Sequence, residues 1–331
     1  MKIKITEMEK ILRRSLTKRG LSVKEAKIVA REYLMGELEG KITHGLMAFP
    51  ALLEANKFFH NNYPRIIKKT PATVFINGNG NVGVLVVDFI LKKVIKDIKK
   101  SGSVLLAINN ISPVLRPGSI AETLAAKNLI GLVFENGGKE MMAPEGGIDP
   151  ILATNPIGIG IPTAGDSIVV DMATSKRAWG EIRLAKRFKH KLLDNTYLDK
   201  KGYFTNNPDK VHSVVPMAGY KGFSLALAIE ILTGSLVQSS MGIRRNVPGT
   251  YQAATRGLVI LVINPAFFGS ATGFKRKNSL LIKQIKQSRK AKGFQEILIP
   301  GERAKRKLLA SQKEGKLEIE KDLYEKLLSF S

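Results

Sequence analysis

The chain has 331 residues and a hydrophobic content of 44%, which suits a protein of two domains and excludes disorder for most of its length. It carries 53 Lys and Arg against 28 Asp and Glu, a formal net charge of +25, and its lack of cysteine excludes disulfides, thiolate metal ligands and a cysteine nucleophile. The N-terminus has no apolar core of signal-peptide length, and the longest apolar run, Val82 to Leu91, is too short to span a membrane. We therefore expect a cytoplasmic protein.

The positive charge by itself suggests a nucleic-acid-binding protein, because basic side chains neutralise phosphates. These lysines, however, are scattered along helical patterns with few aromatic residues between them, and no zinc-finger spacing is present. A solvated basic surface is the interpretation we favour. Binding to nucleic acid stays open as the alternative.

The first part of the chain, residues 3–38, is predicted to form helices. Ser22 and Glu25 have the spacing of a capping box, and the apolar residues that follow recur at helical intervals. Pro50 suits the first turn of a further short helix. Prolines after that helix mark the passage into a second region.

From Thr73 onwards, short strand-like runs alternate with helices. The runs are TVFIN, SVLLAIN, LIGLVFEN, IGIGIP, SIVVDMA and, further along, LVILVIN. Residues 82–100, 120–127 and 223–235 are helical by period, whereas residues 186–210 carry turn signals and predict a surface excursion. The tail from Phe274 is predicted to be helical and basic.

A glycine-rich stretch, NGNGNVG, places Gly78, Gly80 and Gly83 in the spacing of a dinucleotide-binding fingerprint. It follows a strand-like run and opens a helix, as that fingerprint requires. The next strand, however, ends in Asn109-Asn110, without the acidic residue that holds a ribose hydroxyl. A plain glycine turn is therefore the interpretation we favour over a Rossmann fold.

Several short strings are more specific because of their order along the chain. They are Thr43-His44-Gly45 with Pro50, Thr154-Asn155-Pro156, Asp171 to Ser175, Trp179-Gly180, the segment Pro216 to Gly222, and Pro300-Gly301-Glu302. In this order and spacing they resemble the malate/L-lactate dehydrogenase family of NAD(P)-dependent enzymes. The resemblance covers roughly residues 3–328.

That resemblance implies an α+β fold with a non-Rossmann cofactor domain, built on a mixed, mainly antiparallel sheet. It also implies a helical domain formed by the two chain ends, residues 1–72 with 275–331, beside a cofactor-binding domain of residues 73–274. A homodimer with the active site between the domains is implied as well. The glycine-rich stretch then becomes only a turn into a helix.

The resemblance further implies which residues contact NAD or NADP. They are Asp171, Met172, Ala173, Thr174, Ser175, Tyr220, Lys221, Gly301 and Glu302. Small residues after a strand offer amides and hydroxyls to phosphate, and Lys221 supplies a positive charge at a helix start. Without the resemblance, an ordinary strand end and an ordinary helix entry would be the favoured interpretation of these strings. Nothing in the sequence decides between NAD and NADP.

Hydride transfer to a 2-oxo acid leaves an alkoxide that must be protonated, and histidine is the usual proton donor. His60, His190 and His212 lie in polar stretches that predict surface positions. His44 taken alone would also be more often structural, but the Ser-His-Gly of relatives, here Thr-His-Gly, carries the acid/base histidine. The resemblance therefore implies His44 as the catalytic residue.

Three positions depart from the family pattern, all on the substrate side. Ala48 stands where relatives have an arginine suited to a substrate carboxylate, Pro113 where they have a second histidine, and Gly137 ends a stretch that is Thr-Asn-Ser in relatives. Proline transfers no proton and alanine pairs with no carboxylate. Arg116 matches an arginine of the diketogulonate-reductase branch and is our candidate carboxylate anchor.

The predicted function is hydride transfer between NAD(P) and a small 2-hydroxy or 2-oxo acid. The remaining candidate substrate contacts are Asn136, Thr154 and Asn155. A catalytically impaired homologue that still binds nucleotide is the alternative. The dispersed histidines have no metal-ligand spacing, so no metal site is predicted.

Overall fold

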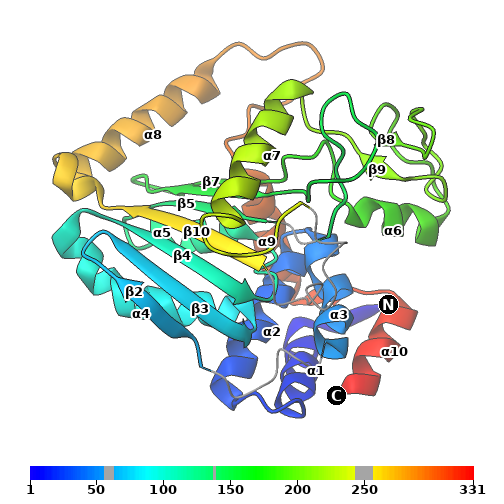
Figure 1. The fold of residues 1–331 in the computed structure, drawn as a ribbon, viewed down its shortest axis with the longest axis horizontal. Coiled ribbons are helices and arrows are strands. Elements are labelled where there is room, and N and C mark those ends of the chain that lie inside the picture. The colour runs from blue at the N-terminus through cyan, green and yellow to red at the C-terminus, as the bar shows by residue number, and fades with distance from the viewer. Residues whose placement is uncertain (56–62, 137–138, 243–255) are drawn as a thin grey trace.

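A seven-stranded sheet lies at the centre of the computed structural model, which describes residues 1–55, 63–136, 139–242 and 256–331 (Figure 1). The strand order is β2-β3-β4-β10-β5-β6-β7, and within this described sheet β3 and β4 are parallel while the other neighbours are antiparallel. The strands are β2 (Arg65–Lys69), β3 (Thr73–Asn81), β4 (Ser103–Ile111), β5 (Ile130–Glu135), β6 (Ile157–Ile161), β7 (Ile168–Met172) and β10 (Arg256–Ile263). This mixed, mainly antiparallel sheet confirms the predicted α+β, non-Rossmann fold.

Alternating side chains of the central strands bury both faces of the sheet. Leu106 and Ile108 of β4 are fully buried on the face covered by α4 (Gly83–Ser101) and α5 (Pro117–Ala125). Ala107, between them, lies on the opposite face, where α7 (Tyr220–Thr233) packs against β5 and β10. Figure 1 shows α7 crossing the sheet on that side. Burial on both faces accounts for the nearly continuous apolar runs of these strands.

The two ends of the chain share one apolar core. Its elements are β1 (Lys2–Lys4), α1 (Ile5–Thr17), α2 (Val23–Leu38), α3 (Phe49–Glu54), α9 (Glu302–Glu314), β11 (Lys316–Glu318) and α10 (Lys321–Phe330). Strands β1 and β11 pair antiparallel, and the terminal ammonium donates to the Ile319 carbonyl at 2.7 Å. The two terminal segments of the chain therefore lie side by side, next to α10 (Figure 1). The exact division into two domains stays a prediction.

Local signals in the sequence locate several helix starts. The Ser22 hydroxyl accepts a hydrogen bond from the Glu25 amide at 3.3 Å, and the Glu25 carboxylate accepts one from the Ser22 amide at 2.9 Å, so the capping box is present. Pro50 lies in the first turn of α3, as predicted. The chain between α1 and α2 is a turn, so the predicted helical region 3–38 comprises two helices after a short strand.

The glycine-rich stretch is part of a strand. Strand β3 continues through it to Asn81, with an irregular register, before α4 begins. A Cβ at Gly78 would lie 2.2 Å from the Ile111 Cγ2, so this glycine permits close packing of β3 against β4. The stretch is therefore not a Rossmann fingerprint, and the predicted glycine turn is also only partly correct, because Gly78 and Gly80 lie within β3 and Gly83 begins α4.

The remaining elements lie around the sheet. Helix α6 (Gly180–Phe188), which the sequence pattern did not predict, precedes the two-stranded pair β8 (Tyr197–Leu198) and β9 (Ser213–Val214). Helix α8 (Ala271–Gln287) follows β10 and a short 3-10 helix, and it has no buried residue. No helix within the described parts of the chain is long and apolar enough to cross a membrane.

Candidate active site

His44 closes a short 3-10 helix (Ile42–His44) that packs tightly against α2. A Cβ at Gly36 of α2 would lie 2.7 Å from the His44 carbonyl oxygen. A Cβ at Gly45 would meet the Glu37 amide nitrogen at the same distance, 2.7 Å. The two glycines thus let the backbone of the turn lie directly on the helix. This close approach fixes where the His44 side chain leaves the backbone.

Glu37 of α2 forms a hydrogen bond with the turn that contains His44. Its Oε2 accepts a hydrogen bond from the Leu46 amide at 3.0 Å. Burial raises the pKa of the Glu37 carboxyl, although the Leu46 amide and the Lys307 cation both act to lower it. A buried acceptor therefore holds the segment immediately after His44.

The His44 ring is half-buried and has a defined hydrogen-bond partner. Its Nδ1 lies 2.9 Å from the Thr43 hydroxyl oxygen, which leaves Nε2 available to a substrate. Burial lowers the pKa of His44; the Asp171 carboxylate acts to raise it, and the cations of Lys41, Arg116 and Arg183 lower it further. The ring is therefore neutral at pH 7, as a proton acceptor requires.

Asp171, at the end of β7, links three parts of the site. Its Oδ1 accepts a hydrogen bond from the Gly118 amide at 3.2 Å, and its Oδ2 forms an ion pair with Lys41, which precedes the His44 turn. A Cβ at Gly118 would lie only 2.4 Å from the Asp171 Cβ, so the start of α5 needs a glycine there. Asp171 thereby joins the sheet, α5 and the His44 turn.

Arg116 is buried among carboxylates of α2 and the segment after it. Its side chain is 3% exposed, with Nε 2.9 Å from Glu32 Oε1 and one terminal nitrogen 2.5 Å from Glu39 Oε2. These partners raise its pKa against the effect of burial. The guanidinium that the sequence offered as a substrate anchor is therefore paired within the protein.

The other candidate substrate contacts are also held by protein groups. Asn136 is fully buried; its amide nitrogen donates to the Ser240 carbonyl at 2.9 Å. Asn155, fully buried as well, donates to Ala226 and to Glu230 at 2.9 and 2.8 Å. The Thr154 carbonyl accepts from the Thr174 amide at 2.9 Å. In this structure, all three tie β-sheet ends to neighbouring segments.

Ala48 and Pro113, two of the positions that depart from the family pattern, have ordinary structural surroundings. Ala48 packs against the helical core, and Gly137 lies outside the described residues. The carbonyl of Pro113 accepts from the Ser112 hydroxyl at 3.3 Å. Beside it, the buried Glu135 carboxylate accepts from the Val114 amide at 3.0 Å, and burial raises the pKa of Glu135.

The cofactor-binding strings converge along β7. Thr174 accepts at its carbonyl from the Met217 amide at 2.9 Å, so the segment Asp171 to Ser175 lies beside the approach to α7. Tyr220 and Lys221 open that helix with exposed side chains, and Met172 is exposed too. Ala173 lies between the exposed Met172 and the buried Thr174. Two of the predicted cofactor strings, distant in sequence, therefore meet at β7, the edge strand of the sheet.

The third string reaches β7 from the C-terminal region. The Val169 amide donates to the Pro300 carbonyl at 3.0 Å, which holds Gly301 against the strand. Glu302 accepts from the Ile299 amide at 3.1 Å and pairs with Lys286. Burial acts to raise the pKa of Glu302, but these two partners lower it overall. Its carboxylate is thus held in the charged form.

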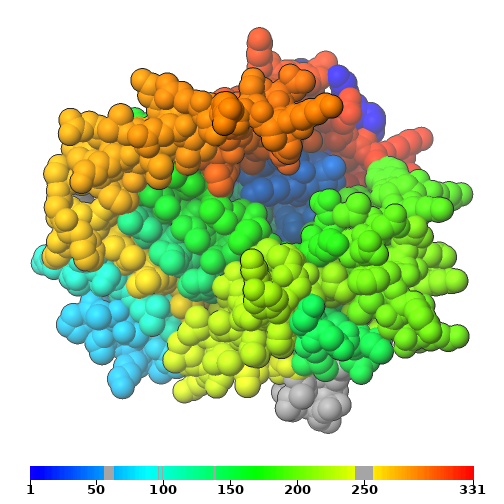
Figure 2. Space-filling view, turned by 90° about the horizontal axis from the view of Figure 1, so that it is seen from above, coloured from blue at the N-terminus to red at the C-terminus, as the bar shows by residue number. Residues whose placement is uncertain are grey.

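The His44 turn, β7 and the Pro300 segment lie around a hollow on one face of the molecule. Figure 2 shows the blue N-terminal part of the chain at the bottom of this hollow, between green and orange segments of the middle and C-terminal parts. The contacts of Asp171 with Lys41, and of Val169 with Pro300, join the same parts of the chain. The candidate site therefore combines residues from the N-terminal, middle and C-terminal parts of the chain, while its position between two domains stays a prediction.

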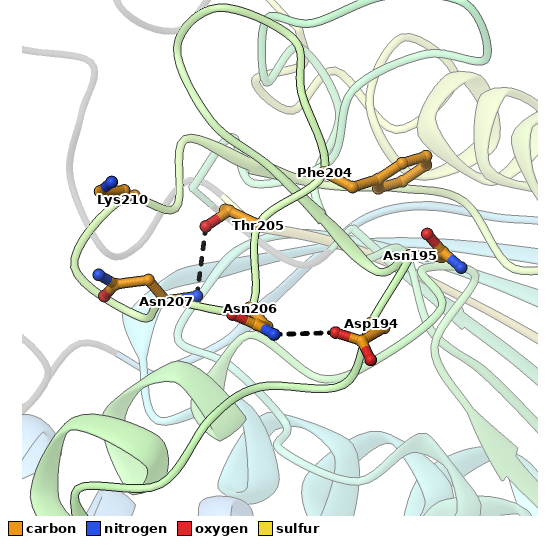
Figure 3. Close-up of a pocket in the computed structure, with 7 residues that line it drawn as sticks. All are labelled: Asp194, Asn195, Phe204, Thr205, Asn206, Asn207 and Lys210. Atoms are coloured by element: carbon orange, nitrogen blue, oxygen red, sulfur yellow. Dashed lines mark hydrogen bonds between the residues drawn. The ribbon is translucent and has the colours of Figure 1, made fainter.

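A second hollow, of about 550 Å³, lies in the predicted surface excursion and carries none of the candidate residues (Figure 3). Its lining consists of Asp194, Asn195, Phe204, Thr205, Asn206, Asn207 and Lys210. Asn206 donates to the Asp194 carboxylate at 2.9 Å, and the Asn207 amide donates to the Thr205 hydroxyl at 3.2 Å. These contacts stabilise turns, and the lining has no proton-transfer pair.

The two other described histidines, His190 and His212, lie near the surface. His190 is exposed at the end of α6, and His212 Nε2 lies 3.1 Å from Asp149 Oδ1 near the surface. His60 is outside the described residues. Within the described residues there is no group of three or more His, Cys, Asp or Glu side chains that could hold a metal ion.

Three charged residues near His44 escaped the sequence analysis: Glu37, Lys41 and Arg183. Glu37 and Lys41 precede a recognisable motif, and only the fold shows that they contact the turn or its partner. Arg183 lies on α6, and its proximity to His44 depends on how that helix packs. The only signal in the sequence for the position of Arg183 was its spacing from Gly180, which is about one helical turn.

Comparison with known proteins gives a consistent result. A model described as malate/L-lactate dehydrogenase matches residues 3–328. The L-sulfolactate dehydrogenase of Methanocaldococcus jannaschii is 34% identical over 99% of this chain and 95% of its own length. A solved structure of sulfolactate dehydrogenase from that organism, also 34% identical, covers 100% of this chain and 96% of that chain with a TM-score of 0.90.

The names of two further relatives specify different nicotinamide cofactors. A ureidoglycolate dehydrogenase (NAD(+)) of Escherichia coli is 28% identical over 99% of this chain and 95% of its own length. A (2R)-3-sulfolactate dehydrogenase (NADP(+)) of Chromohalobacter salexigens is 29% identical over 80% of this chain and 82% of its own length. Both nicotinamide cofactors therefore occur among the relatives.

Proposed function

The chain belongs to the malate/L-lactate dehydrogenase family and is an NAD(P)-dependent oxidoreductase; we propose that it interconverts a small 2-hydroxy acid and the matching 2-oxo acid, with His44 as proton acceptor and donor. The observation that carries this proposal is the environment of His44. The ring is half-buried, is held through Nδ1 by Thr43, and lies near the Asp171 end of the cofactor strings. Malate and sulfolactate, named for relatives, are the first substrates to test.

The residues along β7 fit a dinucleotide. Lys221 presents an exposed ammonium at the first turn of α7, where backbone N–H groups favour phosphate. Gly301 lies close against this strand, since a Cβ there would be 3.1 Å from the Val169 Cβ. When bound, the nicotinamide supplies or accepts the hydride. Lys221 would hold a phosphate, and the backbone of residues 171–175 would position the rest.

His44 handles the proton in both directions. In oxidation, neutral Nε2 takes the proton of the substrate hydroxyl, and burial keeps that nitrogen unprotonated at pH 7. In reduction, the imidazolium returns a proton to the oxygen of the new alcohol. Asp171 stabilises this imidazolium, because its carboxylate acts to raise the pKa of His44. The hydrogen bond between Thr43 and Nδ1 keeps the ring oriented throughout.

The proposal is tested by steady-state assay of the purified protein with NADH and with NADPH against pyruvate, oxaloacetate and sulfopyruvate. Oxidation of the reduced cofactor in the presence of one or more acids is the expected result. Cofactor binding is measured separately through the fluorescence of Trp179, the chain's single tryptophan. Measurable cofactor binding without turnover of any acid would contradict the proposal and favour a catalytically impaired homologue. The loss of activity would then be attributed to Ala48 and Pro113, where relatives have an arginine and a histidine.

We also propose a cytoplasmic homodimer with a helical domain of residues 1–72 and 275–331 and a cofactor domain of residues 73–274, to whose sheet β2 (Arg65–Lys69) of the first segment adds an edge strand. The shared core of the two chain ends supports the helical domain. Exposed apolar side chains on α7 and α8, among them Ile231 and Leu280, support a contact between two subunits. The absence of cysteine suits a reducing compartment. Light scattering coupled to gel filtration measures the mass: twice that of the chain supports the dimer, and a monomer contradicts it.

A further inference from the structure

Helix α6 begins directly on the His44 turn. A Cβ at Gly180 would lie 2.6 Å from both the Cβ and the Cγ2 of Thr43, the residue whose hydroxyl contacts the His44 ring. Residues three apart in a helix lie on the same side of it. Arg183 follows Gly180 by that interval, so its side chain leaves α6 on the side that faces the His44 turn.

Among the basic residues of α6, which are Arg183, Lys186 and Arg187, Arg183 is the one without an ion pair to a described carboxylate. Arg177 lies 3.7 Å from Glu181, Lys186 lies 3.0 Å from Asp209, and Arg187 pairs with Glu320. Over the described ranges, no ion pair includes Arg183, whose side chain is exposed. Its cation is nevertheless close enough to His44 to lower the pKa of that ring.

The other positive charges near His44 are not available to a ligand in the same way. Arg116 is 3% exposed and is paired with Glu32 and Glu39. Lys41 lies in contact with Asp171 and 3.5 Å from Glu39. Ala48, on the other side of the turn, carries no charge. Arg183 is thus the exposed, unpaired cation among the residues that act on His44.

We propose that Arg183 binds an anionic group of the substrate, a carboxylate or a sulfonate, and thereby holds the reacting carbon beside His44. This inference rests on the proposed function and adds a substrate-binding residue to it. A guanidinium presents two parallel N–H donors to the two oxygens of a carboxylate, so it orients the acid as well as attracting it. The substrate side of the site, which lacks an arginine at position 48, then takes its positive charge from α6.

The test compares Arg183→Met and Arg183→Lys with the wild type in steady-state reduction of pyruvate and oxaloacetate. We expect KM to rise by about 10- to 100-fold for Arg183→Met, the usual effect of losing hydrogen bonds to a charged group, with a much smaller change in kcat. The KM of Arg183→Lys should lie between those of the wild type and Arg183→Met, because an ammonium keeps the positive charge but lacks the two parallel N–H donors of a guanidinium. Equal effects on both acids would assign the contact to the shared carboxylate; an effect confined to oxaloacetate would assign it to the second anionic group.

Lys186→Met is the matched control, because it removes one positive charge from the same helix at an exposed residue that is paired with Asp209 and is not among the cations that lower the pKa of His44. It should leave KM unchanged. A second readout needs no turnover: NMR titration of His44 in the free protein should give a raised pKa in Arg183→Met and an unchanged one in Lys186→Met. The other charged groups that act on this ring, Asp171, Lys41 and Arg116, are the same in both variants.

Failure of this inference is distinguishable from failure of the proposed function. Turnover by the wild type with an unchanged KM in Arg183→Met overturns the inference and leaves the enzyme. If the wild type shows no turnover, binding of oxaloacetate with NADH is followed through Trp179, one residue before α6. Weaker binding by Arg183→Met then supports the inference without the reaction, whereas equal affinity, or no saturable binding by the wild type, overturns it.

Discussion

The chemistry of the candidate site depends on the balance of charges around one imidazole. His44 has a carboxylate on one side, Asp171, and several cations on the others, while burial removes water from the ring. Three of these neighbours are held by further contacts: Asp171 by the Gly118 amide, Lys41 by Asp171 and Glu39, and Arg116 by Glu32 and Glu39. The sequence could identify His44 through its motif. It could not show this balance, because the residues that set it come from four separate segments.

Substitution of the two paired residues beside the ring should move the pKa of His44 in opposite directions. Lys41→Met removes a cation and should raise that pKa, and Asp171→Asn removes the carboxylate and should lower it further. NMR titration of the His44 ring measures both shifts. Lys69→Met, which breaks an exposed ion pair with Asp97, is the control. Shifts of the same sign in both variants would contradict this electrostatic account.

Glu37 should prove to be a structural acceptor whose charge is not needed. Glu37→Gln keeps an oxygen for the Leu46 amide, and Glu37→Ala removes it, with an expected loss of about 1–3 kcal/mol. Because the folded-state pKa of Glu37 is raised, the wild type should lose stability relative to Glu37→Gln as the pH rises above the ordinary value of 4.5. Urea unfolding from pH 4 to 8 measures this difference, and an opposite trend would contradict it.

At the scale of elements, glycines determine how closely helices approach strands and turns. Gly158 and Gly160 of β6 face α5, and a Cβ at either would lie within 2.4 Å of a backbone atom of that helix. Such positions were visible in the sequence only as part of IGIGIP. The pattern predicted a strand correctly but gave no reason for its glycines, since the reason is the path of another element.

Gly36→Ala should displace the His44 turn. Its new methyl group would lie 2.7 Å from the His44 carbonyl oxygen, a backbone atom that cannot move without the turn. We expect a loss of about 1–3 kcal/mol in stability, as for overpacked sites, together with a lower kcat. Gly165→Ala, where nothing lies within 4 Å of the added Cβ, is the control for both measurements. Unchanged kcat in Gly36→Ala would show that the turn need not sit on α2.

The sequence predicted most elements and missed one that matters. Strand-like runs and apolar helices were located because burial on both faces leaves long apolar patterns, as in β4 and α4. Helix α6 was missed because it is nine residues long and rich in charge. The site residue that it carries, Arg183, could therefore not be placed near His44 before the fold was known.

At the scale of the whole molecule, the fold brings the two chain ends into one core beneath the site. Leu327 of α10 is fully buried in that core with residues of α1 and α2. This arrangement followed from the family resemblance and from no periodicity, because contacts between residues some 300 positions apart leave no local signal. The net charge of +25, in contrast, follows from the sequence alone, and the structure shows that most of the described basic residues are exposed.

Leu327→Ala should destabilise the N-terminal helices although it lies near the other end of the chain. We expect a loss of about 2–5 kcal/mol, typical of a buried leucine replaced by alanine. Its neighbour Leu328 is 39% exposed, so Leu328→Ala is the matched control and should cost less. Hydrogen exchange locates the effect: amides of α1 should lose protection in Leu327→Ala. Loss confined to α10 would contradict a shared core.

The most direct test of the account is the rate of reduced-cofactor oxidation by His44→Asn beside the wild type, with the best 2-oxo acid of the panel. The asparagine side chain reaches the position of Nδ1 and so retains a partner for Thr43, but it transfers no proton. The account predicts a fall in kcat of about 10²- to 10⁴-fold, with cofactor binding preserved. A variant that keeps the wild-type kcat would show that another group handles the proton.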